Sequence, residues 1–286
     1  MRFSVFTAAT PEWSPDQAVS MLAAQGWDGV EWRVTDQPDA QGAPGFWAGN
    51  RATWPFTGLE DRLGQIARVT AGSGLAYSGI GGYQQASDHD AVLRMLRATA
   101  ELGAERVRVT MPHTRTGTPY PQLFDRTRAD LEWIAARAAE LGVQALVELH
   151  HGTITASASA ALRLVDGLDP AHVGVIHDLG NLVIEGREDH LAALELLGPY
   201  LAHVHVKNVR WVPTDDRRAD GSTVWVHEWA TLRTGQESVA DYLADLRTVG
   251  YDGWVTVEDF STELPLVDRT ADDLAFLRSL VSTDTP

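Results

Sequence analysis

Short runs rich in β-branched and aromatic residues alternate with longer amphipathic segments from one end of this chain to the other. The alternation is typical of repeated βα units, in which parallel strands are covered by helices. Strands are predicted at about residues 2–6, 28–34, 75–80, 105–111, 143–149, 173–178, 202–207 and 253–259. Helices are predicted near residues 15–25, 58–71, 88–102, 122–141, 157–167, 187–198, 238–249 and 269–282. Eight such units in 286 residues predict a single-domain (β/α)8 TIM barrel that spans residues 1–286.

A repeated local phrase supports this count of units. Several helices are expected to end in a glycine that a strand follows within a few residues, as in AAQGWDGVEWRV and AELGVQALVEL. Gly26, Gly103, Gly142 and Gly250 occupy this position, and glycine readily adopts the left-handed conformation that ends a helix. These turns are expected at the bottom of the barrel, away from the catalytic face.

Two long irregular segments are expected at about 35–57 and 208–237. Both follow strands, so both belong on the face where the carboxyl ends of the strands meet, which is the catalytic face of such barrels. The second segment contains VPTDDRRADGSTVWVHEW, in which two strand-like runs flank a polar DG turn. It predicts a hairpin-like insertion at about 208–237, after the seventh strand.

Charge and composition narrow the function classes. The chain has 23 Lys and Arg against 39 Asp and Glu, a net charge of −16 that opposes nucleic-acid binding, so no such partner is expected. No apolar run is long enough to span a membrane, and the N-terminal MRFSVFTAATPEW lacks secretory-signal features, so a cytoplasmic protein is expected. Because cysteine is absent, any metal must be held by His and carboxylate.

Polar residues end four consecutive predicted strands, in VELHH, VIHDLGN, HVHVKN and VTVED. Side chains two residues apart on a strand point to the same side, which directs Glu148, Asp178, His205 and Glu258 toward the barrel interior. Three carboxylates converging with one imidazole repel one another unless a cation lies between them. The sequence therefore predicts one divalent metal ion. Ligand type alone does not choose among Mn²⁺, Mg²⁺, Co²⁺ and Zn²⁺, and Mn²⁺ is taken as the first choice.

This arrangement resembles the xylose isomerase-like, or sugar phosphate isomerase/epimerase, superfamily of barrels, to which AP endonuclease family 2 also belongs. The superfamily includes ketose 3-epimerases, hydroxypyruvate isomerase, inosose dehydratase and isomerase, C-glycoside-cleaving lyases and endonuclease IV. The resemblance implies that the four residues bind the metal and that Glu148 and Glu258 also exchange protons with the substrate. Two departures argue against ketose 3-epimerisation: Asn181 stands where the epimerases usually have a histidine, and Trp211 lies near the place of their arginine.

Further polar residues are expected near the metal. Lys207 and His150 each lie two residues beyond a predicted ligand, on the same side of the strand, and are predicted catalytic groups. Lys207 has an alternative as a lysine that reaches solvent, and His150 as a hydrogen-bond partner of a ligand. His113 and Arg115 follow the fourth strand in VTMPHTR, where His113 is a further catalytic candidate and Arg115 a substrate contact, with a solvated loop position as the alternative.

Other residues have mainly structural interpretations. Glu31 ends the second strand and is expected to be a carboxylate outside the metal ligands, and His203 to be a histidine of the barrel core. Four tryptophans at strand ends or in the long loops are candidates for stacking on a sugar ring, although most tryptophans are core residues: Trp32, Trp54, Trp211 and Trp225.

The predicted chemistry is enolisation. A metal chelated by a carbonyl oxygen and the adjacent hydroxyl acidifies the hydrogen between them and stabilises the enediolate. The first hypothesis is a metal-dependent isomerase or epimerase of a ketose or related small hydroxy-carbonyl compound. The second is a lyase or dehydratase that uses the same chemistry on a keto-sugar, a keto-glycoside or an inosose. An endonuclease IV-like repair enzyme and a non-catalytic sugar-binding protein are less favoured, and the aromatic loops are compatible with a homo-oligomer or a small partner subunit.

Overall fold

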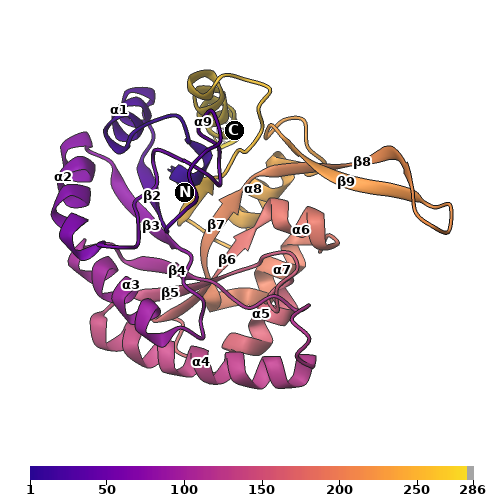
Figure 1. Cartoon of the computed structure of the whole chain (residues 1–286), viewed down its shortest axis with the longest axis horizontal. Coiled ribbons are helices and arrows are strands. Elements are labelled where there is room, and N and C mark those ends of the chain that lie inside the picture. The colour runs from indigo at the N-terminus through magenta and orange to yellow at the C-terminus, as the bar shows by residue number, and fades with distance from the viewer. Residues whose placement is uncertain (282–286) are drawn as a thin grey trace.

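Eight parallel strands close into a barrel in the computed structural model, which describes residues 1–281 (Figure 1). Around the barrel they follow the order β1-β10-β7-β6-β5-β4-β3-β2, so strands that are neighbours in the chain pair with each other once β8 and β9 are set aside. The barrel strands are β1 (Arg2–Phe6), β2 (Gly29–Val34), β3 (Ala76–Gly82), β4 (Arg106–Val109), β5 (Gln144–Glu148), β6 (Val173–Asp178), β7 (Leu201–Val206) and β10 (Trp254–Val257). The (β/α)8 barrel predicted from the alternation is confirmed.

Helices surround the barrel (Figure 1). The α-helices are α1 (Pro15–Gln25), α2 (Leu63–Ser73), α3 (His89–Glu101), α4 (Tyr120–Leu141), α5 (Ala158–Val165), α6 (Leu179–Glu185), α7 (His190–Leu197), α8 (Val239–Thr248) and α9 (Leu266–Val281). The short 3-10 helices are η1 (Thr7–Ala9), η2 (Glu60–Arg62) and η3 (Gly198–Tyr200). The helix predicted at 269–282 corresponds to α9, and residue 282 lies outside the described residues. Within the described residues, no helix is long and apolar enough to cross a membrane.

Local sequence signals explain where α1 begins and where α1 and α4 end. Ser14 and Gln17 form a capping box, in which the hydroxyl of Ser14 accepts from the backbone N–H of Gln17 and the Gln17 side chain accepts from that of Ser14. Gly26 and Gly142 end the two helices at φ 91° and φ 66°, in the left-handed region that glycine adopts without strain. Two of the four predicted C-terminal caps are therefore confirmed, whereas α3 and α8 have their C-caps at Leu102 and Val249, and Gly103 and Gly250 follow one residue later in the left-handed conformation.

Among the described residues, one α-helix was not predicted from the alternation, α6. Its first turn follows β6 without a connecting loop, because the carboxylate of Asp178 at the strand's end accepts a hydrogen bond from the backbone N–H of Asn181 at 2.9 Å. The segment therefore lacks the separate polar turn that marks other helix starts. As a result, Asn181 lies directly beside the carboxyl ends of the strands.

Apolar side chains form two clusters. The large one includes Leu22 and Trp32 and fills the space between the strands and the helices. The smaller one contains Phe6, at the end of β1, and Phe260, which follows β10. Three further aromatic side chains pack against it: Phe46, Tyr83 and Trp229. An aromatic cluster thus lies at the catalytic face of the barrel.

The segment between β7 and α8 contains a two-stranded antiparallel sheet of β8 (Asn208–Arg217) and β9 (Thr223–Ala230). Figure 1 shows this hairpin extending away from the barrel as a long arm. Its register places Trp211 opposite His227 and Val209 opposite Trp229. The two β9 residues therefore lie near the base of the arm, close to the barrel.

Candidate active site

The four side chains predicted as metal ligands meet at the carboxyl ends of adjacent strands. Glu148 and Asp178 are the last residues of β5 and β6, His205 lies near the end of β7, and Glu258 directly follows β10. The backbone N–H of Glu258 donates to Val206 at 3.0 Å, which extends the strand pairing by one residue and keeps the side chain inward. All four side chains are buried, and their ligand atoms lie within 4.8 Å of one another.

The ring of His205 shows that the cluster suits a cation. Its Nδ1 lies 3.5 Å from carboxylate oxygens of Glu148 and Glu258 and 3.8 Å from one of Asp178. This buried nitrogen has no hydrogen-bond partner within the described residues, which is costly for a polar atom. Carboxylate oxygens around one imidazole nitrogen are donors that divalent cations bind. The donor set therefore fits one divalent metal ion.

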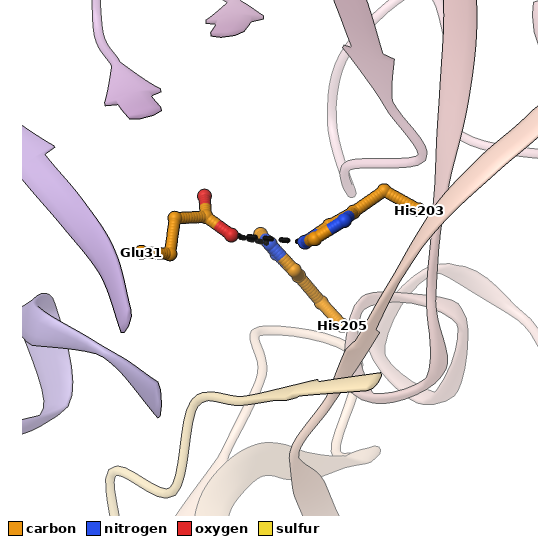
Figure 2. Close-up of side chains that lie close together, drawn as sticks. All are labelled: Glu31, His203 and His205. Atoms are coloured by element: carbon orange, nitrogen blue, oxygen red, sulfur yellow. Dashed lines mark hydrogen bonds and ion pairs between the residues drawn. The ribbon is translucent and has the colours of Figure 1, made fainter. Parts of the chain in front are cut away.

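Behind the cluster, Glu31 fixes the hydrogen positions of two histidines (Figure 2). Its Oε2 lies 3.0 Å from Nε2 of His203 and 3.1 Å from Nε2 of His205. Burial opposes ionisation of Glu31, but the two histidines outweigh it and lower its pKa, so the carboxylate only accepts. Both Nε2 atoms therefore carry the hydrogen. In its neutral form, His205 then directs the free lone pair of Nδ1 toward the carboxylates, as a metal ligand requires.

Two contacts hold Glu148 in its ionised form. Nη1 of Arg108 donates to its Oε2 at 2.8 Å, and Nδ2 of Asn181 donates to its Oε1 at 3.2 Å. Burial would raise the pKa of Glu148, but the charge of Arg108 together with His205, His150 and Lys207 outweighs burial, and the pKa lies well below its ordinary value. A carboxylate held in this way is a weak base.

Glu258 is held in a similar way. Lys207 is buried at the end of β7 and donates to both Asp178 and Glu258. Burial alone would raise the pKa of Glu258, but the charges of Lys207 and His205 outweigh burial and lower it to about 2. The two glutamates are therefore better suited to binding a cation than to accepting a substrate proton.

Asn181 also determines the tautomer of a neighbouring histidine. Its Nδ2 donates to Glu148 and, at 3.1 Å, to the backbone oxygen of Leu149, so its Oδ1 is the acceptor that lies 3.1 Å from Nδ1 of His151. Nδ1 of His150 lies 2.9 Å from the backbone oxygen of His151, which can only accept. Both rings therefore carry their hydrogen on Nδ1 when neutral. Nε2 of each ring is left as an unprotonated acceptor.

Both histidines are neutral near pH 7. Burial lowers the pKa of His150 from 6.5. Burial and repulsion from His150 lower the pKa of His151 to about 4. The site thus contains two uncharged imidazoles beside a cluster of charged groups.

These groups line a cavity of about 450 Å³ at the mouth of the barrel, within the size range of small-molecule sites. The cluster of predicted metal ligands contributes Glu148 and Glu258, with Lys207 beside them. Four histidines line another part: His113, His150, His151 and His227. Four aromatic residues line a third part: Trp47, Tyr83, Trp229 and Phe260. The cavity therefore combines a candidate cation site, neutral imidazoles and an apolar surface.

A family model described as the xylose isomerase-like TIM barrel matches residues 19–280. The chain belongs to this family. The resemblance inferred from the strand ends is therefore confirmed over nearly the whole chain.

Curated relatives of this xylose isomerase-like barrel include inosose dehydratases. The enzyme of Lacticaseibacillus casei is 30% identical over 143 residues, which cover 47% of this chain and 46% of the relative. That of Geobacillus thermodenitrificans is 32% identical over 125 residues, 42% of each protein. The chain thus spans about half the length or less of the curated relatives it matches.

Solved structures of similar fold cover nearly the whole barrel. The 3-keto-D-glucoside 4-epimerase of E. coli superimposes with a TM-score of 0.73 at 17% identity, over 98% of this chain and 99% of that one. The probable 3-DHS dehydratase of Bacillus anthracis gives a TM-score of 0.67 at 16% identity, over 97% and 99% of the two chains. At these identities the likeness shows the fold.

Two predicted sugar-stacking tryptophans lie away from the cavity of this xylose isomerase-like barrel. The indole of Trp32 is completely buried and donates to Thr70 of α2 at 2.9 Å. Trp54 packs edge-on against it, with ring centroids 5.8 Å apart. The prediction that they contact substrate is wrong. The alternation that points Glu31 inward points Trp32 toward the helices, and Trp54 lies in the segment after β2, where it is buried against Trp32.

The remaining predicted substrate residues lie in three different environments. Trp211 is half-buried, donates to the backbone oxygen of Val183 at 3.0 Å and meets the ring of His227 edge-on, so it supports the cavity from behind. Arg115 is exposed and is not among the residues that line the cavity, so its predicted contact with substrate is not supported by its position. His113, from the same loop, does line the cavity.

Several cavity residues were not singled out from the sequence. Arg108 had a usable signal, because it occupies an inward position in the RVRV run of β4, where a charged side chain needs a partner. His151 had none, because the chain turns directly after β5 and the strand alternation no longer applies. Trp47 and Trp229 lie in the loop before α2 and in the hairpin, whose positions depend on contacts distant in sequence.

Glu31→Gln is expected to weaken Mn²⁺ binding about 10- to 100-fold. The neutral amide removes the negative charge that supports Nε2–H of His205 and thereby the donor strength of Nδ1. Competition with a fluorescent chelator measures the affinity, and Glu60→Gln is the control, since Glu60 pairs with Arg94 on the surface. Equal Mn²⁺ affinity in Glu31→Gln and the unchanged protein would show that Glu31 has no influence on the metal ligands.

Proposed function

We propose that this protein is a metal-dependent dehydratase that acts on a ring-shaped polyhydroxy ketone, such as an inosose or a keto-sugar. The reaction removes the proton next to the ketone and expels a hydroxyl group from the following carbon. The matches to inosose dehydratases support this substrate class. The structural observation that carries the proposal is the unprotonated Nε2 of His150. The nearby carboxylates are weaker bases, because Glu148 is paired with Arg108 and Glu258 with Lys207.

The metal would be held by four residues: Glu148, Asp178, His205 and Glu258. When bound, a divalent cation polarises the ketone and stabilises the negative charge that develops as the neighbouring proton leaves. Because Glu148 and Glu258 have lowered pKa values, they act in this proposal as ligands of the cation and not as the general base.

His150 is the general base in this proposal. It lies two residues after Glu148, lines the cavity, and is fixed with its hydrogen on Nδ1 by the backbone oxygen of His151. Its Nε2 accepts the proton from the carbon next to the ketone. The ammonium of Lys207, which also lines the cavity, stabilises negative charge on the substrate oxygens.

The same histidine completes the elimination. A carbon–carbon double bond forms as the carbon–oxygen bond to the leaving hydroxyl breaks, and the imidazolium of His150 returns its proton to that oxygen as water is released. One base on one face of the substrate is sufficient for these two steps. Epimerisation instead needs a second group that delivers a proton to the opposite face.

A sugar isomerase or epimerase is the second candidate function. It is favoured by the positions of Glu148 and Glu258, each of which has an oxygen 3.5 Å from Nδ1 of His205. Two carboxylates flanking one metal could exchange protons on two sides of a substrate. The low pKa values of both groups favour elimination over this alternative.

Reaction in D2O distinguishes the two functions. The Mn²⁺-loaded protein is incubated with a panel of inososes, keto-sugars and ketoses, and the products are followed by proton NMR and ultraviolet absorbance. Elimination is expected to give an unsaturated ketone or its tautomer, whereas epimerisation gives a saturated isomer that carries deuterium. A folded sample that exchanges no proton with Mn²⁺, Mg²⁺, Co²⁺ or Zn²⁺ present would instead indicate a sugar-binding protein.

A further inference from the structure

We propose that the cavity contains a second subsite, an aromatic platform formed by Trp47, Trp229 and Phe260, which binds a further ring attached to the reacting ring. The substrate is then a two-ring compound of the glycoside type. This inference rests on the proposed function, because it takes the reacting ring to lie at the metal-binding cluster.

The platform is continuous with the metal-binding cluster. Phe260 follows the predicted ligand Glu258 by two residues, and Nζ of Lys207 lies 5.9 Å from the centre of the Phe260 ring. The rings of Trp47 and Trp229 have their centroids 4.9 Å and 5.2 Å from that of Phe260. All three line the same cavity, so a ligand at the cluster reaches the platform without a gap.

Trp47 is held in place although its ring is uncovered. Its side chain is 48% exposed, while the neighbouring Phe46 packs against Phe260 at 5.2 Å between centroids. Nη1 of the buried Arg33 donates to the backbone oxygen of Phe46 at 3.1 Å, and its guanidinium lies 5.7 Å from the centre of the Trp47 ring. A large apolar ring that is both anchored and open to a cavity is typical of a ligand-binding surface.

The size of the cavity exceeds that of one sugar ring. At about 30 Å³ for each water molecule, 450 Å³ corresponds to on the order of fifteen water-sized groups. A hexose has roughly a dozen non-hydrogen atoms, and covalently bonded atoms occupy less space than separate waters. A single ring at the cluster therefore leaves part of the cavity unfilled.

The composition of the platform indicates the chemistry of the second ring. Indole and phenyl faces pack against flat apolar surfaces, which are presented by an aromatic ring and by the C–H face of a pyranose. The three residues come from the loop before α2, from the base of the β8–β9 hairpin and from the segment after β10. The hairpin insertion thus contributes directly to substrate selection.

The test compares keto-glucosides that differ only in the group on the anomeric oxygen: methyl, phenyl or glucosyl. Steady-state turnover and D2O exchange are measured with the Mn²⁺-loaded protein. The phenyl or the glucosyl compound is expected to have a KM about 10-fold below that of the methyl compound. Whichever compound shows the gain identifies the second ring as aromatic or as a sugar.

Trp47→Ala and Trp229→Ala should each reduce this preference about 3- to 10-fold. Trp47→Ala is the safer variant for folding, because the ring is half exposed. Trp225→Ala is the matched control, since Trp225 lies on β9 with Trp229, is 51% exposed and is not among the cavity-lining residues. It should leave the preference unchanged.

The possible failures are distinguishable. Turnover of the methyl compound without any gain from a second ring, or a gain that survives both substitutions, overturns the platform and leaves the proposed function intact. If neither the keto-glucosides nor the inososes and keto-sugars exchange a proton, the proposed function fails, and the platform is tested by calorimetric binding of phenyl glucoside. Binding that Trp47→Ala weakens then supports the platform, and no binding overturns it.

Discussion

Glu258→Gln is expected to lower kcat/KM at least about 1000-fold and to weaken Mn²⁺ binding by at least about 100-fold. The substitution removes one of three carboxylates around Nδ1 of His205. It also removes one of the two carboxylates to which the buried Lys207 donates, so that Lys207 is paired with Asp178 alone. Loss of the cation leaves the negative charge on the enolised substrate without its main stabilisation.

Metal analysis of the purified variant, together with turnover and circular dichroism, measures this effect. Glu148→Gln is expected to behave in the same way. Glu263→Gln is the control, because Glu263 is an exposed carboxylate in the segment after Glu258 and lies outside the cluster. Wild-type rates in both cluster variants would mean that the four converging residues are not the reaction centre.

The part of the site that lies on strands could be predicted from the sequence. A barrel imposes a strict alternation, and this rule separates Asp178 from its neighbour His177. In the structure His177 points outward, with Nδ1 2.7 Å from the hydroxyl of Tyr242 on α8, whereas Asp178 joins the cluster. Strand ends are local features, so four short sequence runs were sufficient to find the residues that converge.

The part of the site that lies on loops could not be predicted in this way. Trp47 is positioned by the contact of Arg33 with Phe46, and Trp229 by packing on Phe260 across the catalytic face. Contacts between such distant segments leave no periodic signal in the sequence. The wrong prediction that Trp32 contacts a sugar has a different cause. The alternation already placed Trp32 on the outer side of β2, but its residue type was given more weight than its position.

The hydrogen bonds of Asn181 explain what a residue that departs from the family pattern does in this site. The sequence identified only that an asparagine replaces the histidine usual in ketose 3-epimerases. The structure shows that its amide holds Glu148 and orients His151. This arrangement depends on α6 starting directly at the end of β6, which the sequence did not predict.

His150→Gln is expected to lower kcat about 100- to 10,000-fold while leaving Mn²⁺ affinity nearly unchanged. His150 supplies the unprotonated Nε2 in the proposed mechanism, but it is not one of the converging residues that fit the metal. Exchange of the substrate proton with D2O should fall by the same factor as turnover. In the unchanged protein the acid limb of kcat/KM should lie below pH 6.5, because burial lowers the pKa of His150 and keeps the base unprotonated there.

His113→Gln is the matched control, because His113 lines the same cavity from the loop after β4. It is expected to change kcat less than about 10-fold, which is below the usual contribution of a general base. If His150→Gln still exchanges the substrate proton, while Glu148→Gln retains Mn²⁺ and loses exchange, a carboxylate is the base. That result would favour epimerisation over elimination, since the two glutamates would then act on the substrate as well as on the cation.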